Sequence, residues 1–276
     1  MHGAGNDYVY VNAMKYPISN PEEVAVKWSD RHKGIGSDGL ILIDHSDVAD
    51  FKMRMFNNDG SEGIMCGNGI RCIGKYVYDN RLTTSKTVTI ETLGGIKTLH
   101  LFTDEQNLVT KARVDMGTPQ LTNPKQFALN NGSMLQGIIS LATPNGEAKP
   151  YTGTYVCMGN PHFVIFVDDI TKIDLTAEGS ALEVHKAFPQ KCNIEFAQVR
   201  KDGVVRTRVW ERGTGITQAC GTGACATAVA TILTHQAQDH VTIAMDGGDL
   251  YIEWDGKGHL FMTGPATTVF TGEIEL

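Results

Sequence analysis

Two cysteines stand in nearly the same surroundings at two distant places in the chain. The first motif reads Cys66-Gly67-Asn68-Gly69, and the second, 154 positions later, reads Cys220-Gly221-Thr222-Gly223. The glycines are expected to let the backbone turn tightly and expose its N–H groups. Each motif is predicted to open a helix, where free amides and the positive end of the helix dipole attract anions and lower a thiol pKa. Both cysteines are therefore candidates for reactive thiols.

The same offset of 154 positions links other segments of the chain. Lys52, Arg54 and Phe56 correspond to Arg206, Arg208 and Trp210, and Gly5-Asn6 corresponds to Gly159-Asn160. A shared offset over so long a span predicts an internal duplication with two equivalent halves. If the halves face each other, two thiols point into one cleft from opposite sides.

Two opposed thiols suit the inversion of an amino-acid α-carbon. The α-proton is a very weak acid, so without a pyridoxal electron sink the charge that develops on the carboxylate must be met by aimed donors. Two helix N-termini supply such donors. One thiolate then removes the proton while the opposing thiol delivers another. The pair would share one proton at rest, and a bell-shaped dependence of rate on pH is expected.

Polar residues near the motifs each allow two interpretations. The pair Glu211-Arg212 can bind an ammonium and a carboxylate, although such pairs are more often solvated. Asn57 fits either a substrate contact or a turn. The segment Asn160-Pro161-His162 interrupts an otherwise good strand pattern. His162 either orients a substrate or a thiol, or is a hydrogen-bonded core histidine. The other cysteines, Cys72, Cys157, Cys192 and Cys225, are expected to be small buried hydrophobes.

Alternation of apolar and polar residues predicts mostly strands. Strands are expected at 8–11, 40–43, 52–56, 87–91, 96–100, 163–167, 194–199, 204–210, 241–244 and 250–254, with hairpin turns at Gly94-Gly95 and Gly247-Gly248. Helices are expected from Asn20-Pro21 to about Arg31, from about Asp174 through His185, and after each cysteine motif. The last of these is small or apolar on every side over 224–234, so strands must wrap around it.

These elements predict an α+β fold with two pseudo-symmetric domains that arose by internal duplication. Each domain is expected to be a mostly antiparallel, curled β-sheet around a central helix. Turn residues cluster over 116–124, which favours a domain boundary there. A chain of 276 residues is long enough to bury two cores of this kind.

Composition and charge argue against several classes of function. The net charge of −7, without any run of lysine or arginine, argues against a nucleic-acid partner. Apolar runs are only of strand length and the N-terminus lacks the features of a signal peptide, so no membrane partner is expected and the predicted location is cytoplasmic. Six sparse cysteines predict reduced thiols, and no His/Cys cluster has the spacing of a metal site.

One glycine-rich segment matches a cofactor fingerprint in the wrong context. Residues 34–39 read Gly-Ile-Gly-Ser-Asp-Gly, which fits the dinucleotide pattern G-x-G-x-x-G. That pattern requires a strand before it and a helix after it, whereas here a helix precedes and a strand follows. NAD and FAD are therefore discounted, and no cofactor is expected.

Five segments, taken in order, form a specific set. They are His2-Gly3-Ala4-Gly5-Asn6-Asp7, the glycine-rich segment 34–39, Phe56-Asn57-Asn58-Asp59-Gly60-Ser61-Glu62 leading to the first cysteine motif, Gly159-Asn160-Pro161-His162, and Glu211-Arg212-Gly213-Thr214-Gly215 leading to the second. With these segments the chain resembles the diaminopimelate epimerase family over essentially its whole length. The resemblance implies cofactor-independent interconversion of LL- and meso-2,6-diaminopimelate, in lysine and peptidoglycan-precursor biosynthesis.

The resemblance also implies roles for individual residues. Cys66 and Cys220 are implied as the catalytic thiols, with no metal. The backbone amides of Gly67, Asn68, Gly221 and Thr222 are implied to hold the reacting carboxylate. The distal end of this small amino-acid substrate is implied to be fixed by Asn57, Asn160, Asn193, Glu211 and Arg212. Asn6 is implied as a further substrate-site residue, and His162 as a neighbour of the catalytic pair.

The family's architecture implies that the last strand returns to the first domain. The domains are accordingly expected at 1–117 plus 265–276 and at 118–264, closing around substrate in a homodimer. Family members usually carry several residues ahead of the His-Gly motif, so the first strand is expected to be short.

Three other classes compete with this interpretation. Proline racemases and phenazine-type isomerases would share the duplicated fold but lack the Glu-Arg-Gly ahead of the second motif. A redox protein would instead join Cys66 and Cys220 in a regulatory disulfide, yet such a switch has no use for two anion-binding helix ends. A metalloenzyme is disfavoured because no ligand cluster has suitable spacing.

Overall fold

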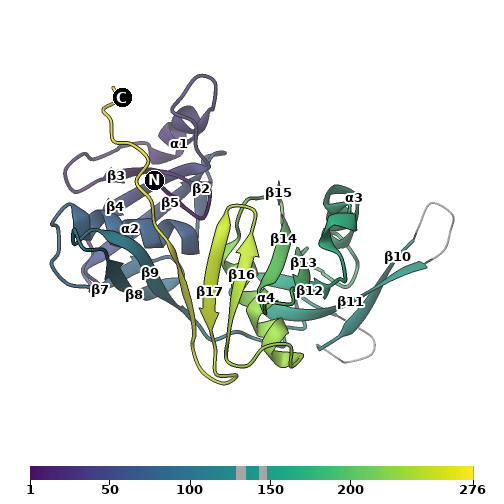
Figure 1. Ribbon diagram of the computed structural model, residues 1–276. Coiled ribbons are helices and arrows are strands. Elements are labelled where there is room, and N and C mark those ends of the chain that lie inside the picture. Colours follow the sequence, from purple (N-terminus) through teal and green to yellow (C-terminus); the bar gives the residue numbers. More distant parts are fainter. Residues whose placement is uncertain (129–134, 143–147, 276) are drawn as a thin grey trace. The chain divides into compact units, whose positions relative to one another are not determined.

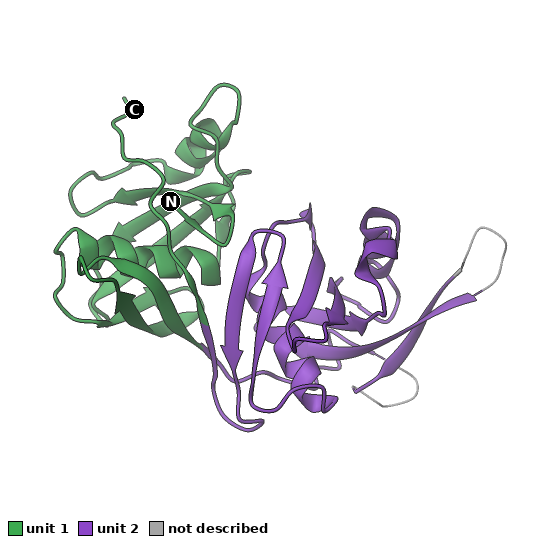
Figure 2. Ribbon diagram, in the orientation of Figure 1, with its two compact units in different colours: residues 1–115, 263–276 green, residues 116–262 purple. Residues whose placement is uncertain are grey.

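The computed structural model describes residues 1–128, 135–142 and 148–275, which form two compact units. Unit 1 comprises Met1–Asp115 and Thr263–Leu276, and unit 2 comprises Met116–Met262 (Figure 2). The chain enters unit 2 once and returns to unit 1 at its end. Each cysteine motif lies in the same unit as its helix.

Unit 1 combines a mixed sheet with two helices (Figure 1). The helices are α1 (Pro21–Ser29) and α2 (Gly67–Asp79). In sheet order the strands are β3 (Val9–Asn12), β4 (Gly39–Asp44), β5 (Phe51–Asn57), β7 (Thr87–Thr92), β8 (Gly95–Thr103) and β9 (Val109–Gly117), with β6 (Glu62–Gly63) beside β5. The short strands β1 (His2–Gly3) and β2 (Asn6–Asp7) pair with each other. Two pairs, β3 with β4 and β5 with β7, are parallel.

Unit 2 repeats this plan around α3 (Leu175–Glu183) and α4 (Gly221–Leu233), with a 3₁₀ turn, η1, at Ile170–Lys172. In sheet order its strands are β10 (Gly137–Ala142), β11 (Ala148–Cys157), β12 (Pro161–Phe166), β13 (Asn193–Val199), β14 (Val205–Glu211), β16 (His240–Met245) and β17 (Gly248–Glu253), with β15 (Gly215–Ile216) beside β14. β12 with β13 and β14 with β16 are parallel. β18 (Leu260–Pro265) carries the chain back to unit 1.

The two units correspond element by element at an offset of 154 positions. Helices α1 and α3, helices α2 and α4, and strands β5 and β14 begin and end at corresponding residues. The parallel pairs correspond as well. Val9 opposite Leu40 in unit 1 matches Phe163 opposite Ile194 in unit 2, whereas Phe51 opposite Ile90 matches Val205 opposite Ile243 with the second partner one residue earlier. The predicted α+β fold with two pseudo-symmetric, duplicated halves is confirmed.

Helix α4 is buried as its composition predicts. The helix is buried continuously from Gly223 to Thr231 and contacts strands β11, β12, β13, β14, β16 and β17. Its threonine hydroxyls are satisfied within the helix, since Thr227 Oγ1 donates to Gly223 O at 2.8 Å and Thr231 Oγ1 to Thr227 O at 2.7 Å. A rigid, fully packed helix therefore fixes the position of Cys220.

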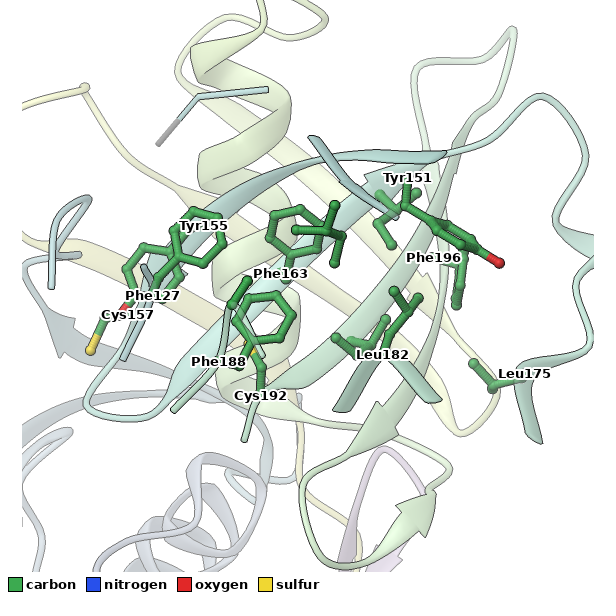
Figure 3. Packing of buried hydrophobic residues seen from close by; sticks show 14 of the residues in the cluster. Phe127, Tyr151, Tyr155, Cys157, Phe163, Leu175, Leu182, Phe188, Cys192 and Phe196 are labelled. Atoms are coloured by element: carbon green, nitrogen blue, oxygen red, sulfur yellow. The ribbon is translucent and has the colours of Figure 1, made fainter. Parts of the chain in front are cut away.

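Hydrophobic clusters hold α1 and α3 against the strands that carry polar residues at their ends. In unit 2, Phe127 stacks on Tyr155 at 5.1 Å and on Phe188 at 5.3 Å, in a cluster that also includes Leu175 and Leu182 of α3 (Figure 3). In unit 1, the smaller counterpart joins α1 to β4 and β5 through Ala25, Trp28, Leu40, Leu42 and Phe56. Close packing of this kind holds the ends of these strands in a fixed position.

Several local predictions were wrong. The segment around Pro161 does not interrupt a strand but begins β12, a position where proline costs no ladder hydrogen bond. Both hairpin turns lie one residue earlier than predicted, because Thr92 pairs with Gly95 and Met245 with Gly248. Strands β9, β10, β11 and β18 are not among the predicted strands.

Candidate active site

Cys66 caps the N-terminus of α2. Its Sγ accepts a hydrogen bond from the amide of Gly69 at 3.3 Å and donates one to Oδ1 of Asn6 at 3.2 Å. Its backbone is extended, with φ −122° and ψ 115°, so the chain turns into the helix directly after it. The thiol is partly exposed and lies at the positive end of the helix.

Cys220 repeats this geometry at the N-terminus of α4. Its φ and ψ are −116° and 112°, and its Sγ accepts from the amide of Gly223 at 3.3 Å. A second neighbour is the Thr222 hydroxyl, 3.5 Å from the sulfur. Cys220 is only 6% exposed, so it is more deeply buried than Cys66. The prediction that both motifs open helices is confirmed.

The second glycine of each motif serves close packing. A Cβ added at Gly69 would lie 2.5 Å from Cδ1 of Ile41, and one added at Gly223 would lie 2.7 Å from Oε1 of Glu195. Both glycines are helical and neither has a positive φ. The expected tight turn is therefore wrong as an explanation: glycine is required because the helix start approaches a neighbouring strand too closely for a side chain.

The backbone amides implied in carboxylate binding occupy the first two positions of the helices. Gly67 and Asn68 begin α2, and Gly221 and Thr222 begin α4. Helix geometry offers amides at these positions no carbonyl from within the helix. Together with the helix dipole, such amides favour a bound anion.

The pKa of the Cys220 thiol is raised well above its usual value. Burial is the main cause, and the nearby carboxylates of Glu211 and Glu195 add to it. Hydrogen bonds from Thr222 and the amide of Gly223 act in the opposite direction without overcoming these effects. For Cys220, the prediction that the helix N-terminus lowers the thiol pKa is wrong, because desolvation and neighbouring negative charge outweigh the dipole.

His162 is fully buried in a polar network of unit 2. Its Nδ1 lies 2.6 Å from Oε1 of Glu195, and its Nε2 lies 3.1 Å from Oδ1 of Asn160. Glu195 is also fully buried, and its other oxygen, Oε2, has no hydrogen-bond partner among the described residues. Sequence reasoning missed Glu195, although a carboxylate inside the apolar run Ile194-Glu195-Phe196 is the kind of residue that rarely occurs in a core without a role.

Asn193 and Glu211 lie at the same end of the paired strands β13 and β14. The Asn193 side chain is buried and donates to the carbonyl of Pro161 at 2.7 Å, while its Oδ1 accepts from the amide of Arg212 at 2.9 Å. The Glu211 carboxylate accepts from the Thr217 hydroxyl, and burial raises its pKa. Asn193 thus fixes the backbone from which the Arg212 side chain projects.

The remaining candidate residues are partly exposed or exposed. Arg212 is exposed and donates from Nη1 to the carbonyl of Gln190 at 3.1 Å. Asn57 ends β5, and its Nδ2 donates to Oγ of Ser61 at 3.0 Å. In unit 1 the structure brings Asn6 against Cys66, and in unit 2 it brings Glu211 and Thr222 beside Cys220. Asn160 contacts His162, which binds Glu195, and Glu195 also lies near Cys220.

Across the described ranges, no group of three or more His, Cys, Asp or Glu side chains is placed to hold a metal ion. None of the helices in those ranges combines the length and apolar character needed to cross a bilayer.

A family model described as diaminopimelate epimerase matches residues 1–122 and 154–269. This chain belongs to the diaminopimelate epimerase family. A relative named diaminopimelate epimerase, from Phocaeicola vulgatus, is 56% identical over 277 residues, which cover 100% of this chain and 97% of the relative. Another of the same name, from Methanococcus maripaludis, is 50% identical over 279 residues, covering 100% and 98%. The protein is therefore an isomerase of the epimerase type.

Solved structures with the same fold include members of both rival isomerase classes. A phenazine biosynthesis protein of the PhzF family from Bacillus anthracis aligns with a TM-score of 0.66 at 19% identity, covering 97% of this chain and 93% of that chain. A probable proline racemase from Agrobacterium radiobacter also aligns with a TM-score of 0.66, at 17% identity, covering 100% and 91%. At these identities the likeness concerns the fold alone, while the family is given by the sequence relatives.

Proposed function

We propose that this epimerase interconverts LL- and meso-2,6-diaminopimelate without a cofactor, with Cys66 and Cys220 as its acid–base pair. The observation that carries the proposal is the matched placement of the two thiols. Each caps a helix of 13 residues and accepts a hydrogen bond from the third helical amide at 3.3 Å. The family and the names of the relatives supply the substrate.

The reaction is a proton exchange at one α-carbon. The thiolate of one cysteine takes the α-proton and becomes a thiol, and the carbon's electron pair delocalises into the α-carboxylate. The amides of Gly67, Asn68, Gly221 and Thr222 stabilise the negative charge as it develops there. The thiol of the other cysteine delivers its proton to the opposite face and becomes a thiolate. Configuration is inverted, and the two cysteines end with exchanged protonation states.

The environments of the two thiols favour one starting assignment. Because the pKa of Cys220 is raised by burial and by neighbouring carboxylates, Cys220 begins as the proton donor. For Cys220 to deliver its proton first, Cys66 must be the thiolate of a pair that carries one proton. After one turnover the assignment is reversed, which serves the opposite stereochemical direction.

The distal amino-acid end is held by the polar residues at the strand ends. Arg212 binds the distal carboxylate and Glu211 the distal ammonium, and Asn57, Asn160 and Asn193 complete the site. The backbone amide of Arg212 is fixed by Asn193, at 2.9 Å, which supports a defined position for the guanidinium stem. In this proposal the enzyme is cytoplasmic, forms a homodimer, and acts in lysine and peptidoglycan-precursor biosynthesis.

The test is incubation of the reduced protein with LL-2,6-diaminopimelate in D₂O, with no cofactor added. NMR follows the α-proton signal while chromatography on a chiral phase follows the stereoisomers. We expect deuterium to enter the α-position as the meso isomer appears. Absence of exchange in fully reduced protein would overturn the proposed substrate, and exchange that depends on added pyridoxal phosphate would overturn the cofactor-independent mechanism.

A further inference from the structure

The glycine-rich segment 34–39 contributes a carboxylate to the cysteine site of unit 1. Asp38 lies in this segment, and its Oδ2 accepts a hydrogen bond from Nδ2 of Asn6 at 2.6 Å. The opposite end of the same amide, Oδ1 of Asn6, accepts the hydrogen bond from the Cys66 thiol at 3.2 Å. One asparagine side chain therefore connects a carboxylate with a catalytic cysteine.

Asp38 is itself held firmly. Its Oδ2 also accepts from the backbone amide of Asp7 at 3.1 Å, and its Oδ1 lies 3.1 Å from Nη2 of Arg31. Arg31 binds the Asp7 carboxylate as well, at 2.9 Å. An ionised carboxylate only accepts hydrogen bonds, so the amide of Asn6 has one permitted orientation, with its NH₂ toward Asp38 and its carbonyl oxygen toward Cys66.

We propose that Asp38 is a positioning residue that fixes the Asn6 amide and thereby raises the proton affinity of Cys66. A carbonyl oxygen can accept from the S–H of a thiol but offers nothing to a thiolate. A hydrogen bond made only by the neutral form disfavours the charged form. This inference takes its purpose from the two-thiol reaction proposed above.

The proposed role of Asp38 is to bring the proton affinities of two thiols in unlike surroundings closer together. Cys220 has two carboxylates nearby, those of Glu211 and Glu195, whereas the corresponding positions of the first half carry Asn57 and Ile41. Proton transfer in both directions needs two groups of similar proton affinity. The carbonyl of Asn6, aimed by Asp38, supplies to Cys66 what the carboxylates supply to Cys220.

Other groups near Cys66 act in both directions. The amide of Gly69 and the helix N-terminus favour the thiolate, and the guanidinium of Arg71 on the same helix donates to the carbonyl of Gly67 at 3.0 Å. Tyr10 on β3 donates to the carbonyl of Gly69 at 3.2 Å, and burial raises its pKa, so it remains neutral. Cys72 is buried and its pKa is likewise raised by burial. Among these groups, Asn6 presents the acceptor that requires a protonated thiol.

The test measures the alkylation of Cys66 in the ligand-free, full-length protein. Iodoacetamide reacts with the thiolate, so the rate at Cys66, followed by peptide mass spectrometry across pH, gives the midpoint of its titration. In Asp38→Asn the side chain can donate as well as accept, so it no longer restricts Asn6 to one orientation and the NH₂ of Asn6 can turn toward the sulfur. We expect the midpoint of Cys66 to fall by about one pH unit, a roughly tenfold faster reaction below the midpoint, while the midpoint of Cys220 stays unchanged.

Two controls separate amide orientation from a simple loss of negative charge. Asp7→Asn removes a neighbouring carboxylate that also binds Arg31 but does not touch the Asn6 side chain, and we expect it to shift the Cys66 midpoint by less than a third of the Asp38→Asn effect. Asn6→Ala should lower the midpoint by itself, and adding Asp38→Asn to it should change little. Equal shifts in Asp7→Asn and Asp38→Asn, or additive shifts in the double variant, would overturn the proposal.

Asn6→Ala leaves the contacts among Asp38, Asp7 and Arg31 in place, so it keeps the proposal testable if Asp38→Asn does not fold. An unchanged Cys66 midpoint in Asn6→Ala would overturn the proposal as well. The readout does not depend on turnover. A shifted midpoint in a protein without epimerase activity would refute the proposed function alone, and an unshifted midpoint in an active epimerase would refute the role of Asp38 alone.

Discussion

At the scale of single residues, the two cysteines share a backbone geometry and one amide donor but differ in their other neighbours. Both accept from a helical amide at 3.3 Å. Cys66 then donates to an amide oxygen, whereas Cys220 lies against a hydroxyl and two carboxylates. The duplication therefore preserved the donor that stabilises a thiolate and diversified the groups that stabilise a thiol.

Removal of either thiol should abolish inversion, because in the proposed mechanism each face of the α-carbon depends on one cysteine. We expect Cys66→Ala and Cys220→Ala to lower kcat by about 100- to 10,000-fold. Cys72→Ala and Cys225→Ala are matched controls, since both remove buried cysteines from the same two helices. They should keep kcat within about threefold of the parent. Near-normal turnover without Cys66 or Cys220 would contradict the two-thiol mechanism.

The raised pKa of Cys220 makes a prediction about pH. The Glu211 carboxylate contributes to that shift, so Glu211→Gln removes a charge that opposes the thiolate. The titration midpoint of Cys220 should fall, and alkylation at pH 8 should become roughly 3- to 10-fold faster. Glu178→Gln, on α3 of the same unit, is the control and should leave the rate unchanged. A midpoint unmoved in Glu211→Gln would contradict a contribution of the Glu211 carboxylate to the pKa of Cys220.

The same shift bears on stability with a definite sign. A group with a raised folded-state pKa contributes stability below its unfolded pKa, which is about 8.5 for cysteine. That contribution is lost as pH rises through the folded pKa. Cys220 therefore makes the folded protein more sensitive to alkaline pH and has no effect of this kind in the acid range.

At the scale of elements, the third position of each cysteine helix is closely packed against a neighbouring side chain. An added Cβ at Gly223 would meet Oε1 of Glu195 at 2.7 Å and the Cys220 sulfur at 3.3 Å. We expect Gly223→Ala to destabilise the protein by about 1–3 kcal/mol and to lower kcat/KM by at least about tenfold. Gly272→Ala, where an added Cβ meets nothing within 4 Å, should be neutral in both measurements. Thermal denaturation and steady-state kinetics check the pair.

Sequence patterns predicted the elements that pack on one strongly apolar or alternating face. Helix α4 and strands β4, β5, β13 and β14 belong to this group, because the spacing of their apolar residues indicates which face is buried. Strand β9 was missed although its buried Ala112, Val114 and Met116 alternate with Arg113 and Asp115. The cysteines, amides and strand-end residues were found through spacing and family resemblance.

The remaining features of the site depend on distances that no periodicity encodes. The pKa of Cys220 is raised mainly by burial and further by carboxylates on two other strands, so the helix dipole alone led to the wrong sign. The partner of His162 lies 33 positions away, and the contact between Asp38 and Asn6 spans 32. Such pairs become visible only when the strands are in register.

At the scale of the whole molecule, the last residues of the chain complete unit 1. The backbone of His2 exchanges hydrogen bonds with that of Thr267, both at 2.9 Å. The buried guanidinium of Arg71 donates to the carbonyl of Pro265 at 3.1 Å, and the amide of Ala266 donates to the carbonyl of Thr110. These contacts tie the start of the chain, helix α2 and strand β9 to its end.

Deletion of residues 263–276 should therefore loosen unit 1 selectively. Loss of the carbonyl of Pro265 leaves a buried charge with one acceptor fewer, which is costly. We expect amide hydrogen exchange in α2 to become at least about tenfold faster, while exchange in α4 changes little. Equal acceleration in both helices would contradict an independent role of the segment in unit 1.

The discontinuity of unit 1 has a consequence for the order in which a ribosome delivers the chain. Unit 2 is one continuous stretch, Met116–Met262, and all of its residues emerge before the final strand of unit 1 is finished. The unit that carries Cys66 is begun first and completed last. Helix α2 must wait for Pro265 while the second half of the molecule is already able to fold. Synthesis of the second thiol site is thus complete before helix α2 can make its contact with Pro265.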